Sequence, residues 1–368
     1  MKSAEISRFL QEHIDAGDFP SAVYLVAQKG EIVFQDALGY AVVEPERIEA
    51  KVDTIYDVAS LTKVLVTGLL VARVIEEKLI SLEDSLGSLL RNFESSDKSD
   101  ISVEQLLTHS SGLPAWKPFY LLASTPSEIV SKIASIPLLD AQPSVVYSDL
   151  NFLLLQAILE DIYGQPLVQL AAALFEQLRL TDTTFNPDRS LRPRIAASEK
   201  GNEHEKRTCQ EQGYELDGFK FRKYQIWGEV HDGNAWFMGG IAGHAGLFST
   251  AAEVLELARQ FLPHHTGILK PETCPLFSTN LTRGMNEARS LGFQLAATPK
   301  STAGEKMSPQ SFGHLGFTGT SLWIDPVRDC VFILLTNRTH NHVLPFTNIN
   351  SVRRGFQNLA IDMLNGQK

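Results

Sequence analysis

Residues 58–67 read VASLTKVLVT, and the apolar positions after Ser60 recur every three or four residues up to Lys78. This period predicts a long helix that begins at Ser60 or Leu61 and buries much of its surface. Positions i and i+3 of a helix lie on one face, so Ser60 and Lys63 are expected to point into the same space. Ser60 also stands at the positive end of the helix dipole, where developing negative charge is stabilised. The stretch therefore suits a serine nucleophile with a lysine beside it.

The four-letter pattern alone cannot decide this, because SSDK at Ser95–Lys98 matches it equally well. The second copy lies in the polar run ESSDKSD, with no helical pattern behind it. A serine that only caps a helix is the competing interpretation of Ser60 itself. The rest of the chain has to separate the two interpretations.

Strand patterns stand near both ends of the chain. Residues 22–41, AVYLVAQKGEIVFQDALGYA, have β-branched and aromatic residues on both sides of a Lys-Gly pair, which predicts a hairpin. Residues 323–335, WIDPVRDCVFILL, predict a second hairpin, followed by a last helix that could pack on the sheet. The middle of the chain is mostly helical up to about residue 185.

These patterns predict an α/β (α+β) fold with a mainly antiparallel sheet built from both chain ends. Residues 1–80 and 231–368 are expected to form a discontinuous α/β domain, and residues 81–230 a mainly helical domain with a loop insertion. The polar stretch SEKGNEHEKRTCQEQG at 198–213 is interpreted as an exposed loop.

Composition narrows the class of protein. The 368 residues are 43% hydrophobic and 21% charged, enough for a substantial core. The net charge of -10 is spread without a basic stripe, which argues against nucleic acid and anionic membrane partners and favours a small molecule or short peptide. The N-terminal segment lacks the apolar core of a secretory signal, so the chain is expected to be cytoplasmic, or periplasmic or extracellular if an export signal has been removed.

Cysteine and histidine patterns give no metal site. Cys209, Cys274 and Cys330 are far apart without CxxC pairing, so we expect free, structural cysteines. His340 and His342 in THNH have no third ligand at a suitable spacing, and we interpret them as a solvated loop. No cofactor and no metal are expected.

A serine hydroxyl is a poor nucleophile without a base. Lys63 could take the proton directly or hold a tyrosine as phenolate. The one Tyr-x-Asn or Tyr-x-Asp pattern is Tyr147-Ser148-Asp149, just before a helical segment. A third group is expected on a strand edge that faces the nucleophile, and four His-x-Gly triplets offer it. They begin at His231, His244, His265 and His314. Only the last leads directly into a strand, GFTGTSLWIDP, so we choose His314.

The segments SLTK, LLTHSSGLP, YSDLNF, GGIAGHAGLFST and FGHLGFTGTSLWIDP, in this order, resemble the serine hydrolase superfamily of class C β-lactamases, DD-carboxypeptidases (penicillin-binding proteins) and related esterases. The resemblance spans roughly residues 20 to 360 and implies the β-lactamase/transpeptidase-like fold, with an all-helical domain beside the sheet. It implies that Ser60 is acylated, that Lys63 is its partner and that Tyr147 is the general base. His314 takes the place of a lysine. The backbone N–H groups of Ser60 and Phe317 would form the oxyanion hole.

Two departures from the family pattern affect the chemistry. Asp149 stands where many relatives have asparagine, and a carboxylate there would hold Lys63 charged and oppose a Tyr147 phenolate. His314 in place of lysine removes a permanent cation from the side that binds a substrate carboxylate, which favours a peptidase-like or esterase-like substrate over an efficient β-lactamase.

Further residues are candidates for binding substrate. Asp149, Gly316 and Thr318 lie within the matched segments. His231, Asp232 and Asn234, in WGEVHDGNAWFMGG, either line the cleft from a loop or form a structural turn; the sequence leaves both open.

The expected reaction is acyl transfer through a Ser60 ester to water, on an ester, an amide or a D-amino-acid peptide. The alternative is a catalytically idle protein of the same fold that binds a peptide or a cell-wall fragment.

Overall fold

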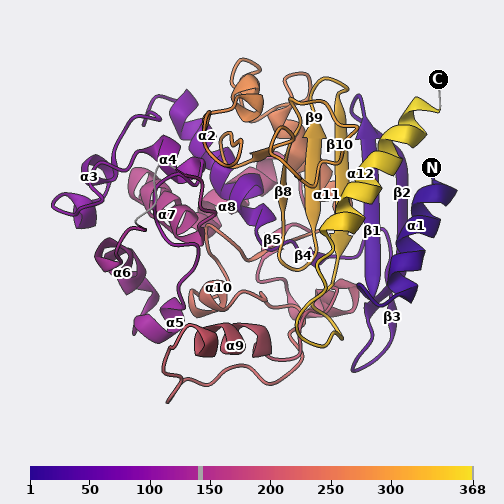
Figure 1. Ribbon diagram of the computed structural model, residues 1–368, viewed down its shortest axis with the longest axis horizontal. Coiled ribbons are helices and arrows are strands. Elements are labelled where there is room, and N and C mark those ends of the chain that lie inside the picture. The colour runs from indigo at the N-terminus through magenta and orange to yellow at the C-terminus, as the bar shows by residue number, and fades with distance from the viewer. Residues whose placement is uncertain (140–143, 367–368) are drawn as a thin grey trace.

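The chain forms a seven-stranded antiparallel sheet with helices on both faces and a helical region beside it (Figure 1). The computed structural model describes residues 1–139 and 144–366. The strands are β1 (Ser21–Gln28), β2 (Glu31–Val42), β3 (Ile48–Glu49), β4 (Tyr56–Asp57), β5 (Thr184–Phe185), β6 (Leu247–Ser249), β7 (Gln294–Leu295), β8 (Phe312–Leu315), β9 (Ser321–Asp325) and β10 (Cys330–Thr336). The strand order in the main sheet is β3-β2-β1-β10-β9-β8-β7, and β4, β6 and β5 form a small second sheet.

Helices cover the sheet and fill the middle of the chain. They are α1 (Ala4–Asp15), α2 (Leu69–Glu76), α3 (Leu86–Leu89), α4 (Val103–Leu107), α5 (Phe119–Leu122), α6 (Ile129–Ser135), α7 (Asp149–Tyr163), α8 (Leu167–Gln177), α9 (Glu203–Glu211), α10 (Gly233–Phe237), α11 (Ala251–Ala258) and α12 (Asn350–Asn365). The predicted helix after Ser60 is present, but Lys63–Gly68 is a π-helical turn that leads into α2. Such turns are rare and often occur at functional sites.

Both predicted hairpins are confirmed. The first joins β1 and β2 through Lys29 and Gly30, and both residues have positive φ. The second joins β9 and β10. Strands β1 and β10 pair over their whole length, with Ala22 opposite Thr336, so the two ends of the chain meet in the centre of the sheet.

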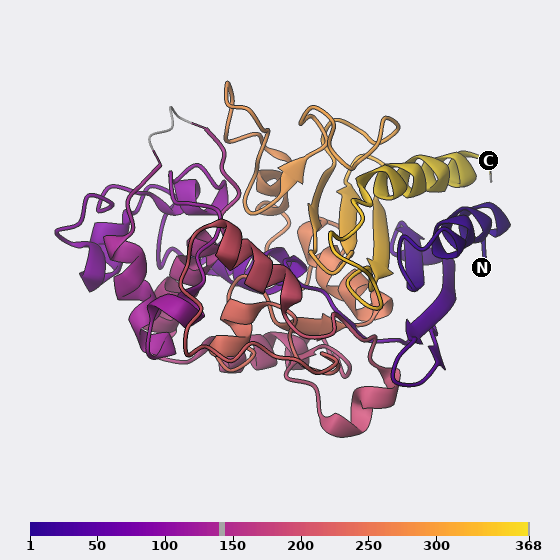
Figure 2. The ribbon, with the colours of Figure 1, turned by 60° about the horizontal axis from the view of Figure 1, so that its bottom comes forward.

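Alternating side chains send each strand's apolar residues to both faces of the sheet. On the outer face, Tyr24 of β1 and Phe332 of β10 pack with Phe356 of α12 and Leu10 of α1 in one cluster. The two terminal helices lie side by side over this face (Figure 2). The last helix therefore packs on the sheet as predicted.

The inner face of the sheet continues into the helical region. Val23 and Leu25 of β1 belong to one buried cluster with Leu106 of α4 and Leu154 of α7. In addition, β5, from the middle of the chain, pairs with β6. The division into two domains at residues 80 and 230 stays a prediction.

The predicted exposed loop at 198–213 is wrong, because most of this stretch is the helix α9. Glu205 and Cys209 lie one turn apart and are its buried residues, and the remaining positions face outward or are half-buried. A helix whose buried stripe is a glutamate and a cysteine has no apolar periodicity, so the sequence pattern could not reveal it.

The segment around His340 and His342 is a loop as predicted, but the expectation that His340 is solvated is wrong. The His340 side chain is buried; Nε2 accepts from the Val43 N–H at 2.8 Å, and Nδ1 donates to the Ser198 carbonyl at 3.0 Å. The histidine therefore connects three distant segments. The expectation of free, structural cysteines agrees with the structure, in which all three are buried and free.

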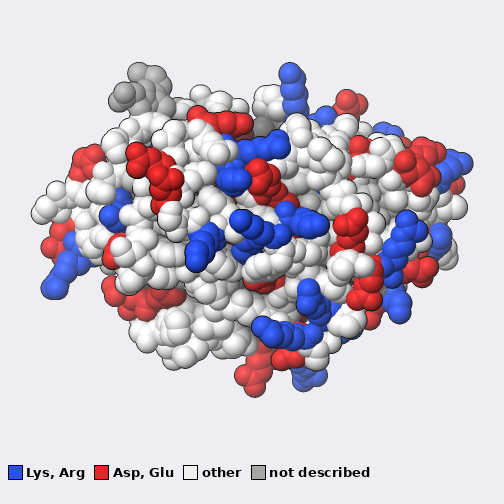
Figure 3. All heavy atoms as spheres, turned by 90° about the horizontal axis from the view of Figure 1, so that it is seen from below, with Lys and Arg blue, Asp and Glu red and all other residues white. Residues whose placement is uncertain are grey.

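Within the described residues, we find no helix with the length and apolar character that a bilayer crossing requires. On the face seen from below, Lys and Arg side chains are interspersed with Asp and Glu, and neither sign forms a continuous band (Figure 3).

Candidate active site

Ser60 follows a strained turn that presents its side chain to a pocket. The residue before it, Ala59, has a φ of 49°, in the left-handed region that a residue with a Cβ rarely adopts. Asp57 holds this turn, because its Oδ1 accepts from the Ala59 N–H at 2.9 Å and its Oδ2 from the His231 N–H at 2.8 Å. Burial raises the pKa of Asp57. Strain of this kind is commonly retained where function needs it.

Lys63 lies one turn after Ser60 and is completely buried. Its Nζ donates to Ser60 Oγ at 2.9 Å and to the His244 carbonyl at 3.1 Å. Nζ also forms an ion pair with Asp149 Oδ1 at 2.6 Å. Burial alone would lower the pKa of Lys63, but Asp149 and Tyr147 outweigh it and the net pKa is raised. Lys63 is thus held as an ammonium.

Tyr147 stands above the same pair, with Lys63 Nζ 5.0 Å from the centre of its ring. Burial raises the pKa of the Tyr147 phenol and outweighs the opposing effects of Lys63 and Ser60. The residue is therefore a neutral phenol that can donate a hydrogen bond.

His109 fixes the segment that carries Tyr147. Its carbonyl accepts from the Val146 N–H at 2.9 Å and its Nδ1 from the Ser148 N–H at 3.0 Å, while its ring lies 4.5 Å from that of Tyr147. This histidine lies in the segment LLTHSSGLP, where no local pattern indicates a role for it. Its spatial link to Tyr147 crosses almost forty residues, which no local pattern can show.

His314 reaches the pocket from the end of β8. Its Nδ1 donates to the Leu315 carbonyl at 2.9 Å, so Nε2 is left as the acceptor, buried and without a partner among the described residues. Burial, Lys63 and Arg289 hold the pKa of His314 well below its ordinary value. It is therefore a neutral acceptor and not a cation.

Arg289 supplies the cation that His314 does not. Its guanidinium lies 5.6 Å from the centre of the Tyr147 ring, and it lines the pocket. Glu287 holds it, with Oε2 2.7 Å from Nη2. No sequence pattern points to this arginine, because it lies in a segment without a recognisable motif.

The loop after β8 is fastened to the turn that carries Ser60. Thr318 Oγ1 donates to the Asp57 carbonyl at 2.7 Å, and Thr320 Oγ1 to the Val58 carbonyl at 3.0 Å. A Cβ on Gly316 would lie 1.9 Å from Thr320 Oγ1 and 2.6 Å from the Val58 oxygen, so only glycine permits this approach.

The two N–H groups predicted to form the oxyanion hole belong to the segments that these bonds bring together. Among the described residues, the N–H groups of Ser60 and Phe317 have no hydrogen-bond acceptor. Both residues line the pocket. Their role in binding an oxyanion stays a prediction.

The segment 231–234 is divided between the pocket and the structure behind it. His231 lines the pocket and its Nε2 lies 2.9 Å from Glu199 Oε2; burial alone would lower the pKa of His231, but Glu199 outweighs it and the pKa is raised. Asp232 also lines the pocket and caps α10 by accepting from the Ala235 N–H at 2.7 Å. Asn234 is fully buried away from the pocket lining.

Asn234 has a structural role. Its side chain accepts from the Phe119 N–H and donates to the Lys117 carbonyl, both at 2.8 Å. The placement does not support Asn234 as a substrate-binding residue, and the same holds for Thr318, which is 2% exposed and bonded to Asp57.

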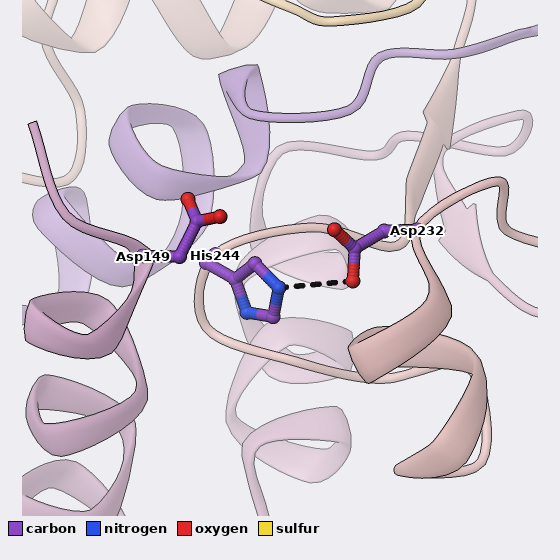
Figure 4. Close-up of side chains that lie close together, drawn as sticks. All are labelled: Asp149, Asp232 and His244. Carbon is purple, nitrogen blue, oxygen red and sulfur yellow. Dashed lines mark hydrogen bonds and ion pairs between the residues drawn. The ribbon is translucent and has the colours of Figure 1, made fainter. Parts of the chain in front are cut away.

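The side chains of Asp149, Asp232 and His244 lie close together (Figure 4). His244 Nε2 lies 3.1 Å from Asp232 Oδ1, and one ligand atom from each of the three residues lies within 4.8 Å of the others. Burial alone would raise the pKa of Asp232, but His244 and Lys63 outweigh it and hold the pKa below its ordinary value. A dication here would stand next to the Lys63 ammonium, so we interpret the two carboxylates as counter-charges of that lysine.

The sequence pattern favours His314 over His244 among the His-x-Gly triplets. In the structure both residues lie at the site. The His314 ring lines the pocket, whereas the His244 carbonyl accepts a hydrogen bond from Lys63 Nζ.

These residues surround one pocket with a volume of about 630 Å³. Of the predicted site residues, the pocket is lined by Ser60, Tyr147, Asp149, His231, Asp232, His314, Gly316 and Phe317. Lys63 lies behind Ser60. The predictions missed Arg289, and also His204 and Glu205, which line the pocket from α9, the helix mistaken for a loop.

Comparison with known proteins identifies the family of the chain. A family model described as Beta-lactamase matches residues 6–353. A protein of Escherichia coli (strain K12) named "Putative D-alanyl-D-alanine carboxypeptidase" is 30% identical over an alignment that covers 95% of this chain and 86% of that protein.

Solved structures agree in fold. A class C β-lactamase from Rhodobacter sphaeroides has a TM-score of 0.73 at 18% identity, with 98% of this chain and all of that chain covered. EstCE1, described as a hydrolase with promiscuous acyltransferase activity, has a TM-score of 0.72 at 21% identity, with 96% of this chain and 97% of that chain covered. At these identities the likeness concerns the fold alone, whereas the family model covers almost the whole sequence. The chain belongs to the Beta-lactamase family.

Proposed function

We propose that the protein is a serine hydrolase that forms an acyl-enzyme on Ser60 and acts on short D-amino-acid peptides or related amides and esters. The observation that carries this proposal is the buried Lys63 ammonium, 2.9 Å from Ser60 Oγ and 2.6 Å from Asp149, at the base of a pocket of about 630 Å³. A lysine fully removed from water and aimed at a serine has little use in a protein that only binds.

Neither expected base is free to accept the proton in the resting state, since Lys63 is an ammonium and Tyr147 a phenol. We propose that Lys63 passes one of its protons to Asp149 as it takes the proton of Ser60. The Ser60 oxygen then bonds to the substrate carbonyl carbon, Asp149 becomes neutral, and Lys63 keeps its charge. The negative charge on the former carbonyl oxygen would be received by the N–H groups of Ser60 and Phe317; losing one such donor typically costs about 3 kcal/mol of transition-state stabilisation.

We infer that Tyr147 completes the acylation step as the acid. Its phenol can donate a proton to the leaving amine or alcohol and recover one through Lys63 from Asp149. Water then attacks the Ser60 ester in the same way, which restores the resting state. The neutral Nε2 of His314 can accept a hydrogen bond from the bound substrate.

Arg289 bears on the choice of substrate. The His314 substitution had suggested that the pocket lacks a permanent cation for a substrate carboxylate, but Arg289 lines the pocket beside Tyr147. A guanidinium pairs well with a carboxylate. This favours a peptide with a free terminal carboxylate, as the name of the Escherichia coli relative also suggests.

A substrate panel tests the proposal against the idle binding protein. We expect turnover of at least one among short-chain nitrophenyl esters, nitrocefin and peptides ending in D-Ala-D-Ala, and loss of that turnover in Ser60→Ala. A purified wild type that hydrolyses none of them, or a Ser60→Ala variant that retains full turnover, would contradict the proposal.

A further inference from the structure

Glu205 is a buried carboxylate of the pocket that the proposed reaction does not use. It reaches the pocket from α9 and is 7% exposed. Its Oε1 accepts from the Gly233 N–H at 2.7 Å, whereas its buried Oε2 has no hydrogen-bond partner among the described residues. An unpartnered buried carboxylate oxygen costs free energy, so its retention calls for an explanation.

The start of α10 brings a second carboxylate beside it. Asp232 caps this helix, and Gly233 follows directly. A Cβ on Gly233 would lie 2.0 Å from Glu205 Oε2, so the glycine makes room for the carboxylate. The two acids interact strongly enough that Asp232 raises the pKa of Glu205.

Each of the other lining carboxylates contacts an ionisable side chain or has both oxygens hydrogen-bonded. Asp149 pairs with Lys63, and the two oxygens of Asp57 accept two backbone N–H groups. Asp232 Oδ1 lies 3.1 Å from His244 Nε2.

The cationic groups near Glu205 are engaged elsewhere. His231 binds Glu199, and the guanidinium of Arg222 donates to Asn202 and to two backbone carbonyls. Tyr120 and Cys209 also face Glu205, and both are neutral. The Tyr120 phenol lowers the pKa of Glu205 as a donor, but it does not reach good hydrogen-bond geometry on Oε2. Among the described residues, no Lys or Arg forms an ion pair with Glu205.

We propose that Glu205, with Asp232, binds an ammonium group of the substrate, so that the preferred substrates are amino-acid amides, esters or short peptides with a free amine. This inference rests on the proposed function, because it names the substrate class of the same pocket. Arg289, one of the arginines that line the pocket, would then meet the carboxylate of a zwitterionic short peptide.

The protonation states are compatible with this pairing. Burial and Asp232 raise the pKa of Glu205 to about 7. A free α-amino group has an ordinary pKa of about 8. Near neutral pH a proton is therefore shared easily between the two, and the bound pair is a carboxylate and an ammonium.

Direct binding tests the inference without any turnover. In a Ser60→Ala background, D-alaninamide and N-acetyl-D-alaninamide are titrated calorimetrically at pH near 7.5. We expect the free amine to bind at least about tenfold more tightly than the acetylated probe, a difference that each ion pair in a desolvated pocket can supply. Adding Glu205→Gln should remove this preference, because glutamine keeps the acceptor for the Gly233 N–H but loses the charge. Glu211→Gln, an exposed residue of the same helix, is the matched control and should leave it unchanged.

Equal binding of the two probes, binding of neither, or an unchanged preference in Glu205→Gln would overturn the inference. If Glu205→Gln does not fold, the comparison of the two probes on the Ser60→Ala protein still decides. The proposed function fails by a different result, the absence of covalent labelling of Ser60 in the wild type, so the two failures can be told apart.

Discussion

Beside Ser60, Lys63 is an ammonium and Tyr147 is a neutral phenol. Burial alone would lower the pKa of Lys63, but the Asp149 carboxylate outweighs this effect, so Lys63 keeps its proton. At the scale of the residue, the central question is therefore where the Ser60 proton goes. The resting geometry gives Asp149 a direct contact with the group that must move it.

Replacing Asp149 with asparagine removes the terminal proton acceptor. We expect the acylation rate of Asp149→Asn to fall by about 10²-fold or more, which is typical for loss of a general base. Stopped-flow measurement of acylation as a function of pH checks this, with the exposed Asp161→Asn on the same helix as the control. If Asp149→Asn instead remains as fast and its profile moves to lower pH, Lys63 alone is the base.

The raised pKa of Glu205 predicts that the free energy of unfolding depends on pH. Its pKa is about 7 in the folded protein against an ordinary value of 4.5, so folding favours the protonated form. Stability is then unaffected below pH 4.5 and falls as the pH rises through 7, by about 3 kcal/mol for this group. Urea unfolding at pH 5 and pH 8 should show that Glu205→Gln loses less stability over this range than the wild type. An identical loss of unfolding free energy in both proteins would contradict the raised pKa of Glu205.

Much of the site could be predicted from the sequence around single residues. The residue that was missed has a physical reason for being hidden. Ser60, Lys63, Tyr147 and His314 were all chosen from local context, and the structure brings them together. Arg289 could not be found, because its relation to Tyr147 exists only after the chain has folded.

At the scale of the element, the loop between β8 and β9 determines whether the pocket is complete. Hydrogen bonds from Thr318 and Thr320 hold it to the turn before Ser60, and Gly316 allows the two backbones to approach. This arrangement places the N–H of Phe317 on the same pocket as that of Ser60.

Gly316→Ala should disturb this loop. The added Cβ has no space against Thr320 and the Val58 carbonyl, so we expect a loss of roughly 1–3 kcal/mol in unfolding free energy and at least about tenfold in turnover. Gly267→Ala is the control, because its Cβ would meet nothing within 4 Å. Thermal unfolding and turnover measured on both variants check the prediction, and equal effects would refute it.

Elements with a clear apolar period were predicted well, and α9 was not. The hairpins β1–β2 and β9–β10 and the helix after Ser60 carry apolar residues at regular spacing. The buried side of α9 consists of Glu205 and Cys209, so an apolar period does not reveal this helix.

At the scale of the whole molecule, the pairing of β1 with β10 joins the two ends of the chain. The terminal helices then close the outer face, where Phe356 of α12 is completely buried and lies 6.0 Å from the ring of Tyr24. The sheet that positions His314 thus depends on residues at both termini.

Phe356→Ala should destabilise the entire fold. Truncation of a buried phenylalanine typically costs about 3–5 kcal/mol. Val343→Ala, at a residue that is 88% exposed, should change the unfolding free energy by less than about 0.5 kcal/mol. Chemical denaturation compares them, and a loss of below about 1 kcal/mol in Phe356→Ala would show that the outer layer is not needed for the sheet.

The most direct test of the account is the mass of the intact protein after incubation with a fluorophosphonate probe or a β-lactam. We predict one covalent adduct in the wild type and in Ser95→Ala, where the exposed serine of the second copy of the pattern has been removed, and no adduct in Ser60→Ala. An unlabelled wild type, or equal labelling of Ser60→Ala, would contradict the claim that Ser60 is the nucleophile.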